Sequence, residues 1–118
     1  MVYVDDMRAP FRSLIMCHML ADTDAELREM ARTIGVQQRW HQGDHFDICL
    51  SKRALAVKAG AIEITLRQAA AMSFRRKVTG KLGLPEEAKQ WREEWRAQRA
   101  AAAAAAAAPQ VQQPGVAG

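Results

Sequence analysis

Short apolar runs, separated by polar residues, predict two strands near the start of the chain. Residues 2–4 are β-branched or aromatic and precede Asp5 and Asp6, which is typical of a short strand and its end. Residues 14–21 are apolar on both alternating faces, which predicts a central strand covered on both sides. The leucine and methionine content of this second run leaves a helix open as an alternative.

A capping box predicts the first helix. Thr23 is followed three residues later by Glu26, and apolar residues then recur at positions 27, 30, 31 and 34, on one helical face. Gly35 follows, where a glycine commonly ends a helix. The pattern therefore predicts a helix over residues 23–34.

The next segment combines short strands with two further helices. Residues 46–49 are compatible with a short strand or with an extended entry to a helix that Ser51 caps. Residues 61–64 favour another short strand. A second capping box at residues 65–68 then predicts a helix that continues to about Phe74.

The last third of the chain has a different composition. Pro85 is suited to the first position of a helix, and the eight alanines at 101–108 favour its continuation up to Pro109. The narrow apolar seam of this helix consists of Leu84, Ala88, Trp91 and Trp95. Residues 109–118 hold no charge and almost no large apolar group, so we expect them to be disordered.

Together these elements predict a small single α/β domain, with a three- to four-stranded sheet packed by helices. The domain is expected to span residues 1–80, with a helical extension over 81–108 and the tail at 109–118.

The connection between the first two strands has a geometric consequence. Residues 7–13 are too few for a parallel crossover, which favours an antiparallel hairpin. In such a hairpin we expect Asp5 and Asp6 to lie about 15 Å from His18 along the sheet.

Composition and charge narrow the class of protein. The net charge of +4 is compatible with a nucleic-acid or phosphate-bearing partner, and equally with a solvated basic surface. The chain start has no signal-peptide pattern, and the apolar run at 14–21 is too short to cross a bilayer. We therefore expect a cytoplasmic protein without membrane contact, in which Cys17 and Cys49 are free thiols.

Several short motifs together resemble a known family. They are Asp5-Asp6, residues 18–22, Leu27 with Gly35, residues 45–47, residues 52–56 and Gly60-Ala61. The combination resembles the bacterial and phage family catalogued as domain of unknown function 4031, over about residues 2–75. The resemblance implies a small cytoplasmic domain in bacteria or their phages, and it implies no established activity.

Histidines and aspartates provide the main candidate for chemistry. We predict that His18, His45 and Asp47 are metal ligands or acid–base groups, with Asp6 as a further catalytic or supporting carboxylate. Mixed imidazole and carboxylate ligands suit zinc, manganese or iron(II), so the expected cofactor is a divalent metal. The alternative is structural, with His18 hydrogen-bonded in the core and Asp47 stabilising a helix N-terminus.

A second candidate site lies at the predicted helix start that follows. Ser51, Lys52 and Arg53 combine free backbone N–H groups with two cations, which favours phosphate binding. The alternative is two solvated cations near Asp44 and Asp47.

Two functions follow from these candidates. The first is binding of a phosphate-bearing ligand, nucleotide or nucleic acid, with metal-assisted phosphoester hydrolysis as the reaction to test. Trp40 then either stacks on a base or covers the core. The alternative is a non-enzymatic interaction or structural protein, in which Trp91 and Trp95 dock on a partner or on a second copy.

Overall fold

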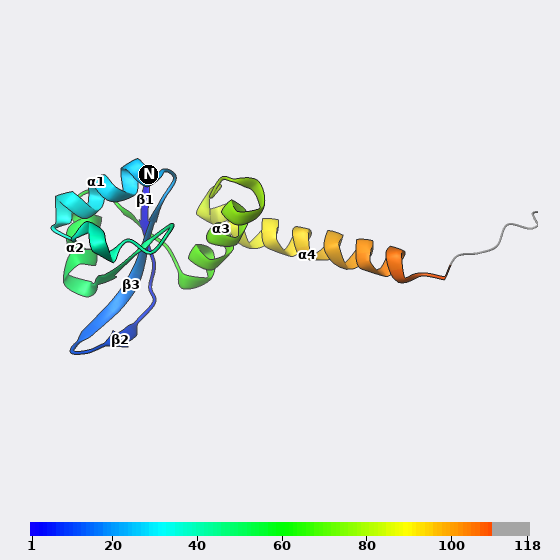
Figure 1. Cartoon of the computed structure of the whole chain (residues 1–118), viewed down its shortest axis with the longest axis horizontal. Helices are drawn as coiled ribbons and strands as arrows, with labels where there is room; N and C mark the ends of the chain where they lie inside the picture. The colour runs from blue at the N-terminus through cyan, green and yellow to red at the C-terminus, as the bar shows by residue number, and fades with distance from the viewer. Residues whose placement is uncertain (110–118) are drawn as a thin grey trace, which may run out of the picture.

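The protein has a mixed α/β fold, as its sequence pattern predicts (Figure 1). The computed structural model describes residues 1–109, so the predicted disorder of the tail falls almost entirely outside the described residues. Five short strands form one mixed sheet, and a long C-terminal helix extends away from it.

The central strand organises the sheet. β3 (Leu14–Ala21) pairs antiparallel with β1 (Val2–Val4) and β2 (Ala9–Phe11) along one edge. Its other edge pairs antiparallel with β4 (Phe46–Cys49), and β5 (Ile62–Glu63) lies parallel to β1. The apolar run at 14–21 is therefore a strand, because both of its edges are hydrogen-bonded to other strands.

A bulge interrupts the pairing between β1, β2 and β3. Val4 lies opposite Met19 while Ala9 lies opposite Met16, so four residues on one side face two on the other. The backbone N–H of Asp5 donates to the carbonyl of His18 at 3.1 Å. The expected separation of about 15 Å between these residues is therefore wrong, because residues 9–11 continue the hairpin as β2 and place β1 opposite the second half of β3.

Two helices cover the first face of the sheet, and a short 3₁₀ turn, η1 (Gln38–Trp40), is hydrogen-bonded to the first of them through Gln38 and Arg28. α1 (Asp24–Ile34) begins as predicted, with the Thr23 side chain accepting from the backbone of Glu26. α2 (Leu50–Lys58) begins earlier than expected, with Cys49 rather than Ser51 at its N-cap. The reason is that Cys49 still pairs with β3, which supplies the extended backbone of the cap. The core on this face includes Cys17, Met19, Leu27, Ala31, Phe46 and Ile48.

α3 (Leu66–Thr79) covers part of the second face. It begins at the predicted capping box, in which Thr65 and Gln68 bond reciprocally. The helix continues five residues beyond Phe74, where we expected it to end, and stops at Gly80, whose φ is 85°. No breaker lies between residues 75 and 79, and arginine and lysine favour helix.

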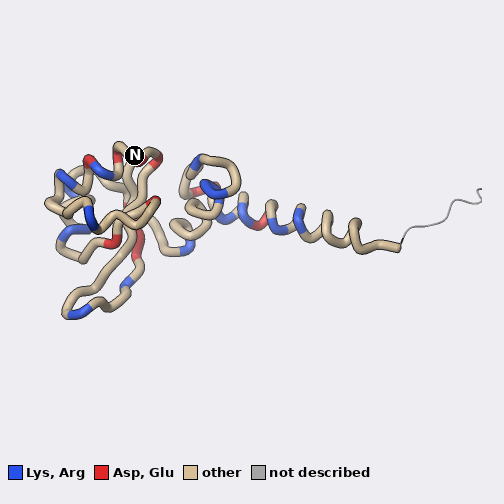
Figure 2. Tube along the Cα trace, in the orientation of Figure 1, with Lys and Arg blue, Asp and Glu red and all other residues tan. Residues whose placement is uncertain are grey.

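The long helix packs on α3 before it leaves the domain. α4 (Pro85–Ala107) has a fully buried Ala88 near its start. The ring centroid of Phe74 lies 4.8 Å from that of Trp95 and 6.1 Å from that of Trp91. The seam predicted to dock on a partner thus contacts α3 of the same chain. Figure 2 shows charged residues along the first half of α4 and none along the alanine tract.

The sequence predicts a protein without membrane contact and with two free thiols. Within residues 1–109, no helix combines the length and apolarity needed to cross a membrane. Cys17 and Cys49 are both free, as expected. Burial raises the pKa of the Cys17 thiol to about 12, so this cysteine is a core residue rather than a reactive group.

Candidate metal centre

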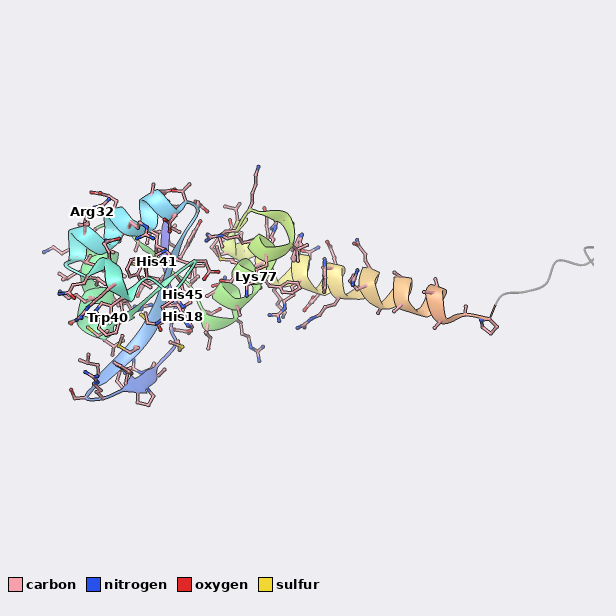
Figure 3. The ribbon with its side chains drawn as sticks, in the orientation of Figure 1. His18, Arg32, Trp40, His41, His45 and Lys77 are labelled. Carbon is pink, nitrogen blue, oxygen red and sulfur yellow. The ribbon has the colours of Figure 1, made fainter. Side chains whose placement is uncertain are left out.

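Three of the predicted site residues come together on the second face of the sheet. His18 on β3 lies directly opposite Asp47 on β4, and His45 precedes β4 (Figure 3). Each offers one ligand atom, and these atoms all lie within 4.8 Å of one another. All three residues are half-buried, so an ion could reach the group. The group could hold a metal ion.

One carboxylate oxygen lies between the two imidazoles. Asp47 Oδ1 is 3.4 Å from Nε2 of His45 and 3.8 Å from Nε2 of His18. The two rings are nearly perpendicular, with centroids 5.2 Å apart. Asp47 Oδ1 is buried and has no hydrogen-bond partner among residues 1–109. A buried anionic oxygen without a partner is destabilising, and a cation bound between the three residues would remove that penalty.

The far side of each imidazole is held by another carboxylate. Nδ1 of His18 lies 2.7 Å from Asp5 Oδ2, and Nδ1 of His45 lies 2.8 Å from Asp44 Oδ1. When Nδ1 donates to a carboxylate, the neutral ring presents its Nε2 lone pair to the opposite side. This carboxylate–histidine arrangement is the usual support of histidine metal ligands, because it fixes both the tautomer and the ring orientation.

Asp5 is the most constrained residue of the group. It is fully buried, and Oδ1 also accepts the backbone N–H groups of His18 at 2.9 Å and Met7 at 3.2 Å. Burial alone would raise the pKa of Asp5, but the hydrogen bonds and the charge of His18 lower it overall. The same contact with Asp5 raises the pKa of His18, against the effect of burial. Asp5 therefore stays ionised and stabilises a proton on His18.

The Asp5–His18 pair predicts how the stability of the metal-free protein depends on pH. Because the pKa of His18 is raised on folding, its contribution is complete below about pH 6.5 and disappears as the pH rises through the folded pKa. The pKa of Asp5 is shifted in the opposite direction, because folding lowers it. Its contribution to the stability of the fold is therefore present above about pH 3.9 and disappears as the pH falls further. In EDTA, the melting temperature should therefore decline as the pH rises above about 6.5.

His18→Gln should reduce this alkaline decline, because the amide does not titrate. Thermal melts of both proteins across the pH range would measure the difference. An equal decline in the parent and the variant would contradict the assignment of the pH dependence to His18.

The other predicted carboxylate and the third histidine lie elsewhere. Asp6 is exposed, and its Oδ1 accepts the backbone N–H of Leu66 at 2.6 Å, at the start of α3. Asp5 therefore has the supporting position that we expected for Asp6. His41 bonds to Asp24 Oδ1 at 2.8 Å through Nε2, away from the group of three.

The predicted phosphate site does not form one cluster. Ser51 Oγ lies 3.2 Å from the Cys49 thiol. Lys52 extends toward Gly35 at the end of α1. Arg53 donates to the carbonyl of Asp5 at 2.8 Å and to Glu63 at the same distance. The three side chains have different surroundings because consecutive helical residues point about 100° apart.

A cavity of about 230 Å³ opens beside the two histidines. His18, Leu20, Asp44 and His45 line one wall, while α3 lines the other with Leu66, Ala69, Ala70, Ser73 and Lys77. Figure 3 labels Lys77 on α3, next to His18 and His45. Lys77 was not predicted from the sequence as a site residue, because a cation in the last turns of a helix is explained by the helix dipole alone. Its role depends on how α3 lies on the sheet.

The comparisons with known proteins identify a family for the chain, but they indicate no activity. The family described as Protein of unknown function (DUF4031) matches residues 2–76. This range includes every residue of the candidate metal centre, with Lys77 immediately after it. No curated protein and no solved structure matches the chain.

Proposed function

The chain belongs to the DUF4031 family, and from the geometry of its candidate site we propose that it is a metal-dependent phosphoester hydrolase. His18, His45 and Asp47 hold a divalent transition metal. Asp5 and Asp44 orient the two imidazoles, and Lys77 binds the phosphate group of the substrate.

The unpartnered Asp47 oxygen is the observation that carries this proposal. It faces the Nε2 atoms of both histidines, whose Nδ1 atoms are already bonded to carboxylates. In a tetrahedral zinc site, ligand atoms lie about 3.3 Å apart, given metal–ligand distances near 2.0–2.1 Å. The separations of 3.4 and 3.8 Å from Asp47 Oδ1 are close to this spacing. Two imidazoles favour zinc, manganese or iron(II) over magnesium or calcium.

Three protein ligands leave coordination positions for water and substrate. A divalent metal in such a site supplies a hydroxide nucleophile near neutral pH and polarises a phosphoryl oxygen. The 230 Å³ cavity next to His18 and His45 has room for a phosphate group. Lys77, on the opposite wall, offers a compact positive charge that would stabilise the charge of the phosphoryl oxygens.

The test compares His45→Ala with His41→Ala, a matched histidine outside the group of three. Metal-stripped protein is supplied with zinc, manganese or iron(II), and bound metal is measured after dialysis. The parent should bind metal and hydrolyse bis(p-nitrophenyl) phosphate, and His41→Ala should bind metal with the affinity of the parent. His45→Ala should lose more than about 100-fold in metal affinity, since loss of a group that only orients a metal ligand already costs about 10–100-fold.

The experiment separates the metal site from the reaction. Equal metal binding by the parent and His45→Ala would refute the metal site. Metal binding without ester hydrolysis would refute the proposed activity but not the proposed metal site. Lys77→Gln, which preserves the metal ligands, should raise KM for the phosphoester because a cation facing the phosphate is lost.

A further inference from the structure

A second cavity adjoins the candidate metal centre on the other side of Asp47. Its volume is about 310 Å³, within the range of small-molecule sites. Apolar side chains dominate its walls, which include Phe11, Leu14, Met16, Trp40 and Ile48. Asp47 lines this cavity, whereas His18 and His45 line the first one. The three residues of the candidate metal centre thus line both cavities between them.

We propose that this second cavity binds the planar aromatic ring of an anionic substrate, with the base of a nucleotide as the fitting example. The inference rests on the proposed function and names its substrate class. The phosphate would lie at the metal and Lys77, and the aromatic group would lie against Trp40. Such a substrate is a nucleoside phosphate, either free or at the end of a nucleic-acid strand.

The rim of the cavity exposes large apolar groups that come from two separate parts of the chain. Phe11 and Leu14 belong to the β2–β3 hairpin and are 43% and 46% exposed. Trp40 belongs to η1 and is 40% exposed. Three large apolar side chains gathered around one hollow form a surface that a ligand can desolvate, unlike scattered exposed residues.

Trp40 lies on a turn that is fixed from both ends. The Gln38 side chain accepts from the Arg28 guanidinium at 3.2 Å and donates to the Arg28 carbonyl at 3.3 Å. On the other side of Trp40, His41 bonds to Asp24 of α1 and packs its ring against Phe46. An exposed tryptophan on an anchored turn is a preorganised platform, so stacking a ring on it requires little ordering.

The charges around the cavity suit an anion. Arg39 and Lys52 both line it, and the Arg39 guanidinium lies 5.1 Å from the centroid of the Trp40 ring. Neither cation is ion-paired within the part of the chain that the structure describes. A phosphate-bearing aromatic ligand complements this combination of apolar walls and unpaired cations better than a neutral apolar ligand does.

The test measures binding of AMP and of ribose 5-phosphate, which differ by the base. Calorimetric titrations use the metal-free protein and the zinc-loaded protein. The parent should bind AMP about tenfold more tightly than ribose 5-phosphate, in line with base–aromatic stacking. Trp40→Ala should abolish this difference, and Trp40→Phe should keep most of it. Leu55→Ala is the control, because Leu55 is 45% exposed and lies outside the cavity.

Several outcomes would overturn the proposal. The aromatic site would be refuted if the parent bound AMP and ribose 5-phosphate equally, or if the preference for AMP persisted in Trp40→Ala. Either result would leave the proposed metal binding and hydrolysis unaffected. An AMP preference that persists in His45→Ala, in the absence of metal binding, would support the cavity independently of the proposed reaction. A single-stranded tetranucleotide serves as a second ligand, and tighter binding than AMP would support a nucleic-acid end as the source of the base.

Discussion

Replacing Asp47 with asparagine is expected to remove metal binding while leaving the metal-free fold at least as stable as the parent. The change deletes the charge of a half-buried carboxylate whose Oδ1 is buried and has no partner among residues 1–109. The new amide can donate to Nε2 of His45, which lies 3.4 Å from the present oxygen. In the metal-free protein, a buried oxygen without a hydrogen-bond partner is thus replaced by an amide that has one, which should not destabilise the fold. With metal, an anionic ligand is lost, and affinity should fall by more than about 100-fold.

Two measurements on the same protein check this expectation. Competition with a chromophoric chelator gives the affinity for zinc, and thermal melts in EDTA give the stability of the metal-free fold. Asp24→Asn is a matched control, because Asp24 also contacts a histidine but lies outside the group of three. Its metal affinity should equal that of the parent. Metal binding by Asp47→Asn at parental strength would refute the proposed coordination.

The same experiment distinguishes the structural interpretation of Asp47. A carboxylate that only stabilised the start of α2 would contribute about 0.3–1 kcal/mol to the metal-free protein. Asp47→Asn would then lower the melting temperature slightly and leave metal affinity unchanged. The structural role predicts a lower melting temperature of the metal-free protein, whereas the metal-ligand role predicts an equal or higher one. The direction of the change therefore distinguishes the two roles.

Asp5→Ala is expected to destabilise the fold more than any other single change in the site, by about 3–5 kcal/mol. The substitution leaves three donors without an acceptor: the backbone N–H groups of His18 and Met7, and Nδ1 of His18. It also removes the buried counter-charge of a protonated His18. Urea denaturation near pH 6 measures the loss, because both partners of the pair are then charged.

Asp6→Ala is the matched control for this prediction. Asp6 is the adjacent carboxylate, but it is exposed and its carboxylate accepts the N–H of Leu66 at the start of α3. Its removal should cost about 1 kcal/mol, as for a helix cap. A loss for Asp5→Ala no larger than that for Asp6→Ala would show that Asp5 does not stabilise the site. In Asp5→Asn, where the side chain keeps its shape, metal affinity should fall about 10–100-fold.

Local chemistry in the sequence determined where most helices begin and end. The Thr23 side chain caps α1, the full capping box at residues 65–68 is formed, and Gly35 ends α1, because side-chain bonds to neighbouring backbone groups need no distant partner. The sequence also predicted His18, His45 and Asp47 as a candidate group, because histidines are few in the chain and these residues lie in or beside short apolar segments. The α/β class followed from the apolar pattern alone.

Only the tertiary structure decided which aspartate supports the site. Asp5 and Asp6 are adjacent and chemically equal, but the bulge after β1 turns Asp5 toward His18 and leaves Asp6 at α3. The approach of α3 placed Lys77 beside the histidines. The approach of η1 to the β2–β3 hairpin formed the cavity around Trp40. Register and packing depend on contacts between residues far apart in the chain, and the spacing of residues along one segment does not encode them.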